Sequence, residues 1–346
     1  MHGKLHRLIT QAVANRLKLP EPIVPFLCEG SEAPDRFADY ETKMYVTRSG
    51  RVRTRKVRVK HHGTPFRVIK RTALKARHLL LKAEDAPARS EANWFNKLLK
   101  HTREDLQERG SYLAGRVLHY LQDNVIIGPS VDKLAHDKLE RECANIDPAS
   151  CIEKTKLKRL VCKKEVYKEI ESVKTHNDPL EVMKRAIEHS YSVGSSIFSP
   201  SEAPPDLNKL GNEVYRNLKD KGKLILFYSA ILLLVPIILL ITTSSVILSF
   251  LTLLPSTILA AHGFVVARSR NINTVLRATQ RMPRWIIYVC VGSFLTDIFL
   301  GGVGASICIL LVILFYFLFL RSPAWKRIKD EIDWFKWVLQ PTRDSI

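Results

Sequence analysis

The fold class follows from residues 111–126, which read SYLAGRVLHYLQDNVI. Apolar side chains recur there at spacings of three and four, the pattern of a helix with one buried face. His119 and Asp123 are four residues apart, so on a helix they project from the same face, one turn apart. The stretch therefore predicts a buried helix that carries an imidazole and a carboxylate.

The same spacing extends outward from this stretch in both directions and predicts a mostly helical domain over residues 1–198. A linker and juxtamembrane helix are expected over 199–222, where Ser199–Pro205 is rich in proline. The helices predicted besides 111–126 are 6–17, 73–81, 91–108, 131–144, 152–173, 179–192 and 206–221.

One segment of the domain lacks a helix pattern. Residues 43–60 alternate basic with apolar or β-branched residues and predict a small extended hairpin. From Lys43 to Arg77 there are 13 Lys and Arg residues and no acid, so this segment attracts polyanions. Anionic lipid of the inner leaflet is the favoured partner, nucleic acid is second, and a merely solvated surface is the third interpretation.

Charge is distributed unevenly. The chain of 346 residues has 54 Lys and Arg against 34 Asp and Glu, a formal net charge of +20. Yet residues 224–267 and 285–320 contain one charged side chain, Asp297. These two stretches predict four transmembrane helices over residues 223–320. Asp297 is interpreted as interfacial, and the spans are interpreted as an anchor that could also mediate homo-oligomer formation.

The basic segments around the apolar stretches predict an orientation. Arg-rich residues 268–284 and the Lys/Arg-bearing tail contain the charge expected on the cytoplasmic side. An integral protein of an inner or plasma membrane follows, with its N-terminal domain, middle loop and tail in the cytosol. Residues 321–346 alternate tryptophans with basic residues and predict an amphipathic cytosolic tail in the headgroup layer, or packed on protein.

Cysteine use and the N-terminus fit a cytosolic domain. The six cysteines form no CxxC pair, which indicates reduced thiols rather than disulfides or a cysteine-based metal site. Residues 1–7 contain no apolar run of the kind found in a secretory signal. We therefore expect no export by that route.

A second imidazole and carboxylate pair follows the first. His136 and Glu140 repeat the four-residue spacing of His119 and Asp123 on the next predicted helix. Two such pairs on neighbouring helices can converge on divalent metals, with zinc the usual choice for His and carboxylate ligands. Satisfied core histidines are the alternative. His101 and Asp105 share the spacing but stand among charged neighbours, and are interpreted as a solvated helix face.

Further motifs precede these pairs in a fixed order. His6 lies on the first predicted helix, residues 30–36 read GSEAPDR in a predicted turn, and His61 and His62 follow. With HYLQD at 119–123 and HDKLE at 136–140, the first 200 residues or so resemble the zinc-dependent phospholipase C family. Its superfamily also contains the trinuclear-zinc single-strand nucleases. The resemblance implies an all-helical domain with two or three zinc ions in a cleft.

The resemblance also implies a ligand set. One zinc would be held by Asp35, His61 or His62, His119 and Asp123. A second would bind Asp123 and His6, and a third would bind His136 and Glu140. The family has another histidine where this chain has Gly128-Pro129-Ser130, so the third site lacks a ligand unless Asp132 completes it. Asp35 is the candidate that orients or deprotonates the attacking water.

These motifs predict hydrolysis of phosphodiesters or phosphomonoesters. The favoured function is phospholipase C-like release of phospholipid headgroups by a membrane-anchored enzyme. A metal-dependent nuclease of the same superfamily is the first alternative, and the second is a non-catalytic membrane scaffold with a degenerate metal site. Few aromatic residues accompany the basic segment, which favours lipid over single-stranded nucleic acid.

Overall fold

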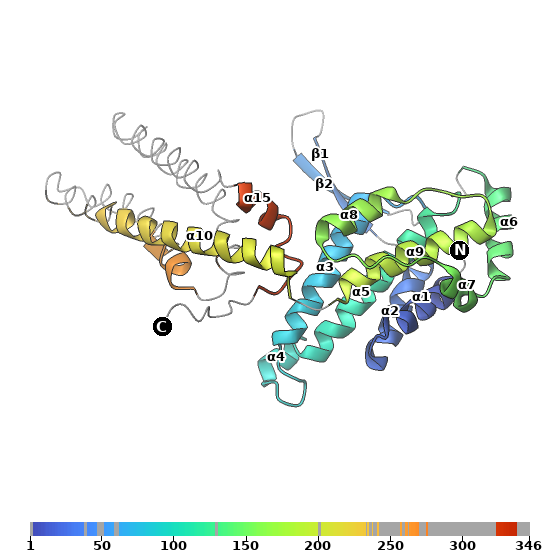
Figure 1. Ribbon diagram of the computed structural model, residues 1–346, viewed down its shortest axis with the longest axis horizontal. Coiled ribbons are helices and arrows are strands. Elements are labelled where there is room, and N and C mark those ends of the chain that lie inside the picture. The colour runs from blue at the N-terminus through green and yellow to red at the C-terminus, as the bar shows by residue number, and fades with distance from the viewer. Residues whose placement is uncertain are drawn as a thin grey trace. The chain divides into compact units, whose positions relative to one another are not determined.

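The computed structural model describes two compact units, residues 1–201 and 202–346 (Figure 1). Described within them are residues 3–37, 40–46, 52–58, 62–128, 131–199, 202–232, 263–269 and 323–337, with a few single positions between 234 and 275. The first unit is helical apart from one hairpin, which confirms the predicted helical class. Its elements are α1 Gly3–Leu17, the 3₁₀ turn η1 Glu21–Ile23, α2 Val24–Arg36, β1 Tyr40–Val46, β2 Val52–Arg58, α3 Phe66–Asp85, α4 Trp94–Leu98, α5 Arg103–Asn124, α6 Lys133–Ala144, α7 Pro148–Lys154, α8 Lys163–Ser172 and α9 Pro179–Ile197.

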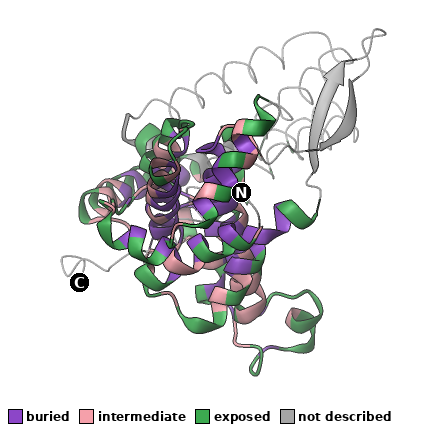
Figure 2. Cartoon of the chain, turned by 90° about the vertical axis from the view of Figure 1, so that its right-hand side faces the viewer, coloured by how far each residue is buried: buried purple, intermediate pink, exposed green. Residues whose placement is uncertain are grey.

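Helix α5 is the central element of this unit. It packs most extensively against α2 and α3, and next against α9. Its residues Val117, Leu118 and Leu121 are at most 1% exposed, so the predicted apolar face is the face that is buried. Figure 2 shows buried residues along the inward faces of the surrounding helices. A helix buried on several sides can hold polar side chains away from water.

Two glycines set how closely α2 approaches α5. A Cβ atom on Gly30 would lie 2.0 Å from the carbonyl oxygen of Tyr112, and one on Gly115 would lie 2.0 Å from that of Leu27. Neither position can hold a side chain unless the helices separate. The turn predicted at residues 30–36 is wrong, because these residues form the last turns of α2 and Gly30 serves helix packing instead.

The extended hairpin occurs where the sequence predicted one. Strands β1 and β2 pair antiparallel, with Tyr40 opposite Arg58 and Val46 opposite Val52.

Two predicted helices, in contrast, are each divided in two. Thr102 and Asp105 form a capping box that starts α5 separately from α4. Asp147 caps α7 and Glu165 completes a capping box at the start of α8, so 152–173 is not one helix. Local capping outweighed the continuous apolar pattern.

The expectation of four transmembrane helices over 223–320 is not met. Nowhere in the described ranges does a helix combine the length and the apolar character needed to cross a bilayer. Helix α10, Pro205–Leu232, enters the first expected span, but it carries Lys219, Asp220, Lys221 and Lys223 just before its apolar end. Residues 281–320 and most of 233–280 lie outside the described residues. The assignment as an integral membrane protein with cytosolic domain, loop and tail is therefore corrected.

The described part of the tail, residues 323–337, follows the second of the two interpretations of its sequence, packing on protein. Helix α15 covers only Pro323–Lys329, and turns follow it. Trp334, Phe335 and Trp337 are at most 2% exposed. The space over Gly211 of α10 is filled by the indole of Trp337, whose Cζ3 atom would lie 2.3 Å from an added Cβ. The aromatic side chains of the tail are thus covered by protein and not by a lipid headgroup layer.

Candidate metal centre

The predicted ligands from three helices converge in the first unit. His6 of α1, Asp35 of α2, and His119 and Asp123 of α5 each offer one ligand atom, and these atoms lie within 4.8 Å of one another. His6 Nε2 is 3.1 Å from Asp123 Oδ1, and His119 Nε2 is 3.0 Å from Asp123 Oδ2. His119 Nε2 is also 3.8 Å from Asp35 Oδ1. We call these four residues the first group.

A second group lies next to the first. His62, His136 and Glu140 also offer ligand atoms within 4.8 Å of one another. His136 Nε2 is 3.2 Å from Glu140 Oε1, and the rings of His62 and His136 meet edge to face with centroids 4.6 Å apart. His62 Nδ1 lies 3.7 Å from Asp123 Oδ1. Asp123 therefore faces both groups at once.

Each group depends on a pair of residues four apart on one helix. Asp123 lies one turn after His119 on α5, and Glu140 lies one turn after His136 on α6, as the sequence predicted. The other members come from elements distant in the chain. Asp35 reaches the first group because α2 crosses α5 at Gly30 and Gly115, and His62 precedes the start of α3.

Hydrogen bonds fix the orientation of three histidine rings. His119 Nδ1 donates to the backbone oxygen of Ser31 and His136 Nδ1 to that of Ile127, both at 2.8 Å. His6 Nδ1 donates to Gln122 Oε1 at 2.7 Å. A carbonyl oxygen only accepts, so each Nδ1 carries the proton and each Nε2 is turned towards the carboxylates. Histidines that bind a metal through one ring nitrogen usually donate the N–H of the other nitrogen to such an acceptor.

Gln122 is itself held by two hydroxyl groups. Its amide nitrogen donates to Ser190 Oγ at 3.1 Å and to Thr10 Oγ1 at 3.4 Å, and its side chain is fully buried. Both bonds fix which end of the amide faces His6. The sequence pattern did not single out Gln122, although a glutamine beside Asp123 in an apolar stretch was the available signal.

The spacing of the ligand atoms suits zinc. Zinc binds nitrogen and oxygen ligands at about 2.1 Å, so two ligands of a tetrahedral ion are about 3.4 Å apart. The nitrogen to oxygen distances of 3.0–3.2 Å within the two helical pairs and between His6 and Asp123, and 3.8 Å from His119 to Asp35, bracket this value. With Nδ1 protonated, a neutral ring presents the lone pair of Nε2 to the carboxylate, and a cation between the two atoms would stabilise that arrangement. The residues present therefore fit bound metal.

The first group combines a buried carboxyl whose pKa is lowered with two buried imidazoles. Burial lowers the pKa of His6, and the neighbouring His119 lowers it further. Burial opposes ionisation of Asp123, but His119 and His6 hold the pKa of that carboxyl well below its usual range. Burial also lowers the pKa of His119, but the neighbouring Asp123 carboxylate raises it, and the pKa is raised overall. A buried, ionised Asp123 thus requires positive charge beside it.

The observed grouping differs from the implied ligand set in two respects. His6 joins Asp35, His119 and Asp123, whereas His62 joins His136 and Glu140. His61 lies outside the described residues. Asp132 belongs to neither group, because its side chain caps α6 by accepting from the backbone N–H of Ala135 at 3.0 Å. The described residues thus form two groups, where the resemblance implies two or three zinc ions.

The pair formed by His101 and Asp105 stays outside both groups. Asp105 belongs to the capping box of α5 and also binds Arg89, and His101 is exposed.

Comparison with protein families, with curated proteins and with solved structures found no match to this chain. The resemblance to the zinc-dependent phospholipase C family thus remains a prediction from its motifs.

Proposed function

We propose that the chain is a zinc-dependent phosphoesterase that hydrolyses phosphodiesters of phospholipid headgroups, as phospholipase C enzymes do. The convergence of both groups on Asp123 carries this proposal. Neighbouring metal sites that share a carboxylate are suited to phosphoryl chemistry. When bound, zinc supplies a Lewis acid for phosphoryl oxygens and lowers the pKa of a coordinated water.

The ligand residues divide into buried and open ones. His6, His119 and Asp123 are fully buried, whereas the side chains of Asp35 and His62 are 22% and 14% exposed. A substrate therefore approaches from the side of Asp35 and His62. The buried residues hold their positions through bonds to Ser31 and Gln122, while Asp35 is open to the approaching phosphodiester.

Asp35 is the most exposed member of the first group, and its carboxylate therefore lies on the side from which a substrate approaches. Its Oδ1 atom is 3.8 Å from His119 Nε2, and its side chain is part-exposed at the C-terminal end of α2. A carboxylate at this place can accept a proton from a water that attacks phosphorus. We assign Asp35 this role in addition to that of a metal ligand. The other ligands are His6, His62, His119, Asp123, His136 and Glu140.

A nuclease is the second candidate, favoured by one observation. The basic strand β2 ends at Arg58, four residues before His62, so a segment that attracts phosphate leads directly to the second group. A nucleic-acid backbone and a phospholipid both offer phosphodiesters. The substrate test must therefore include both.

The test compares three substrates and the metal content. Purified wild-type protein is assayed on a soluble nitrophenyl phosphodiester, on phosphatidylcholine vesicles and on single-stranded oligonucleotides, with metals measured by mass spectrometry. We expect zinc and headgroup release from vesicles, and loss of both in a His119→Ala, Asp123→Ala double variant. His176→Ala, at a part-exposed histidine outside both groups, is the matched control. Cleavage of oligonucleotides but not of vesicles would establish the nuclease, and a metal-free active protein would refute both candidates.

A further inference from the structure

An exposed apolar helix lies away from the metal groups, in the loop of residues 86–102, which we call the α4 loop. Helix α4 is at the lower edge of Figure 1 and is coloured mostly as exposed in Figure 2. Its large apolar side chains are far more exposed than the core: Trp94 74%, Phe95 51%, Leu98 68% and Leu99 44%. So much apolar surface on one short segment marks an interaction site.

The helix is held in this conformation by caps at both ends. The side chain of Asn93 accepts a hydrogen bond from the N–H of Asn96 at 2.9 Å. At the other end Lys100 adopts φ of 51°, in the left-handed region, and the N–H of His101 bonds to the oxygen of Asn96 at 2.9 Å. A non-glycine residue enters this region only at an energetic cost. The α4 loop therefore has a defined fold that points its apolar side chains outward.

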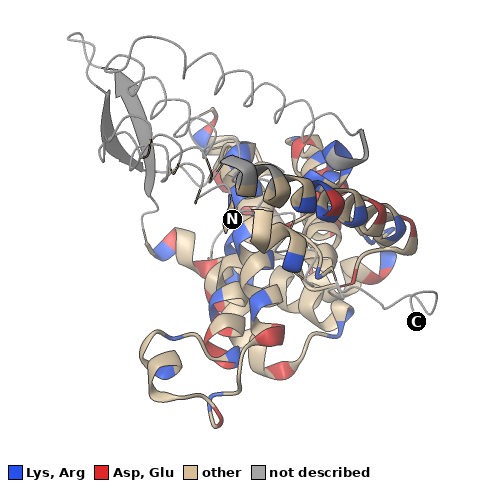
Figure 3. Ribbon diagram, turned by 90° about the vertical axis from the view of Figure 1, so that its left-hand side faces the viewer, with Lys and Arg blue, Asp and Glu red and all other residues tan. Residues whose placement is uncertain are grey.

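The base of the α4 loop is closed by Arg89 and by the backbone. The N–H of Arg103 donates to the oxygen of Pro87 at 2.9 Å. Arg89 Nη2 pairs with Asp105 Oδ1 at 2.8 Å and with Glu108 Oε1 at 3.2 Å. Asp105 and Glu108 are thus engaged at the base. Exposed Glu91 is the one acid of the α4 loop, and residues 92–102, which follow it, contain no acid and include Lys97 and Lys100. In Figure 3, α4 itself is tan and blue.

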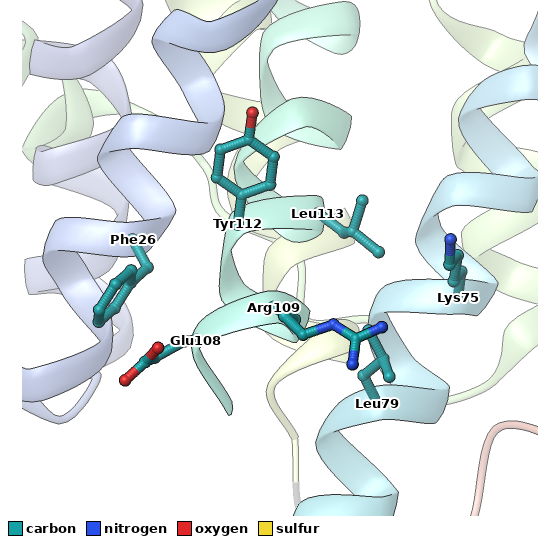
Figure 4. Close-up of a pocket in the computed structure, with 7 residues that line it drawn as sticks. All are labelled: Phe26, Lys75, Leu79, Glu108, Arg109, Tyr112 and Leu113. Carbon is teal, nitrogen blue, oxygen red and sulfur yellow. The ribbon is translucent and has the colours of Figure 1, made fainter. Parts of the chain in front are cut away.

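A groove of about 320 Å³ adjoins this base (Figure 4). Glu108, the partner of Arg89, is one of its lining residues. Two cations, Lys75 and Arg109, face the groove beside apolar walls, and neither forms an ion pair within the described part of the chain. The remaining lining residues are Phe26, Leu79, Tyr112 and Leu113. A cationic groove with apolar walls suits an anionic amphiphile.

We propose that the α4 loop is a docking site for an anionic lipid surface. Tryptophan, phenylalanine and leucine side chains beside lysines are the composition of segments that lie at a lipid and water interface. The cations of Lys97, Lys100, Lys75 and Arg109 complement the negative headgroups. A protein partner would fit the apolar residues, but it would leave the absence of acids over residues 92–102 unexplained.

This docking site is independent of the metal groups. From Arg103 to His119 there are 16 residues of α5, which correspond to about 24 Å of helix at 1.5 Å per residue. The α4 loop and the first group thus occupy different parts of α5. Substitutions in the loop should leave metal content and hydrolysis of a soluble phosphodiester unchanged, whichever way the proposed function is decided.

The first experiment measures sedimentation of the full chain with vesicles. We expect the double variant Trp94→Ser, Leu98→Ser to bind vesicles of equal phosphatidylglycerol and phosphatidylcholine about tenfold or more weakly than wild type. The matched control is Val131→Ser, Leu134→Ser, at residues that are 78% and 84% exposed near α6. Lys97→Gln, Lys100→Gln should weaken binding to these vesicles but not to pure phosphatidylcholine. Equal binding by wild type and the Trp94, Leu98 variant would overturn the proposal.

The second experiment places an environment-sensitive fluorophore at Leu98→Cys in a Cys162→Ser background, because the other described cysteines are buried. We expect a blue shift with anionic vesicles at constant protein concentration, and none for the same label at Leu134→Cys. A shift that appears without vesicles and grows with protein concentration would identify a second copy of the chain as the partner and overturn the proposal. An emission wavelength that does not change when anionic vesicles are added would also overturn the proposal.

Discussion

His6 Nε2 lies 3.1 Å from Asp123 Oδ1, although the two residues are 117 positions apart in the chain and both are fully buried. The contact brings the first helix of the domain against the central one. Burying an ionised carboxylate is costly unless a cation compensates it. We interpret this pair as one edge of a metal site, and the first three of the four predictions below follow from that site and its supports.

The two groups should lose metal separately. His136→Ala removes a ligand of the second group and leaves the first intact, so we expect the zinc content to fall by about one ion per chain. Asp123→Asn removes the carboxylate that faces both groups and should lower the content further. Mass spectrometry of protein purified without chelators measures this. Equal losses in the two variants would show that they do not form distinct sites.

Gln122 should act as a positioning residue for His6. Gln122→Leu removes the oxygen that accepts from His6 Nδ1, and we expect zinc affinity to fall about 10- to 100-fold. Gln122→Glu retains an acceptor at this place and should largely restore binding. Equilibrium dialysis measures the affinity, and Gln11→Leu on α1 is the control. Nitrogen NMR of His6 adds a readout of the ring tautomer. An unchanged tautomer and affinity in Gln122→Leu would contradict this role.

Gly115 should be needed for both stability and metal binding. A Cβ atom at this position would lie 2.0 Å from the oxygen of Leu27, so Gly115→Ala must push α2 away from α5. We expect a loss of about 3 kcal/mol in unfolding free energy, measured by urea denaturation. Metal affinity should fall as well, because α2 carries Asp35.

Gly194→Ala is the matched control for this substitution. Its Cβ would lie 3.4 Å from the nearest atom, on the flexible side chain of Leu17, so the residue has room. Alanine also favours a helix interior over glycine. We therefore expect this variant to be as stable as wild type or slightly more stable. Equal destabilisation by both substitutions would exclude the close crossing of α2 and α5 as the cause.

The acid stability of the metal-free domain should depend on Glu169. His189 Nδ1 lies 2.7 Å from Glu169 Oε1, and this hydrogen bond lowers the pKa of the carboxyl. A lowered carboxyl pKa gives stability above the unfolded value of about 4.3 that is lost as pH falls through the folded value. Glu169→Gln should therefore flatten the decline in stability between about pH 5 and pH 3. Thermal unfolding over this pH range measures the effect, and exposed Glu153→Gln should behave like wild type.

The sequence predicted the helices, the hairpin and the ligand pairs within one helix. Apolar periodicity is a local property, and residues four apart on a helix must lie on one face whatever the rest of the chain does. The same local reasoning failed at the ends of elements. It extended helices through Thr102 and through residues 155–162, because a capping side chain interrupts a helix without changing the apolar pattern.

It also assigned segments to the wrong surroundings. The buried indoles of Trp334 and Trp337 satisfy the same pattern as an interfacial helix, since protein and lipid both remove apolar surface from water. Glycine is common in turns, yet Gly30 lies in a helix at a point where the backbone of another helix is too close for a side chain. The sequence does not show which group covers the indoles or approaches the glycine, so only the tertiary structure distinguishes these alternatives.

By itself, the sequence determined which residue types could bind metal and which pairs would share a helix face. Tertiary structure alone decided that His6 joins Asp35, that His62 joins His136, and that Gln122 and Ser31 orient the rings. The physical reason is that these contacts join residues up to 117 positions apart, whose separation depends on how closely α1, α2 and α5 pack. The glycines that permit this packing make no ligand bond, but without them the ligands could not meet.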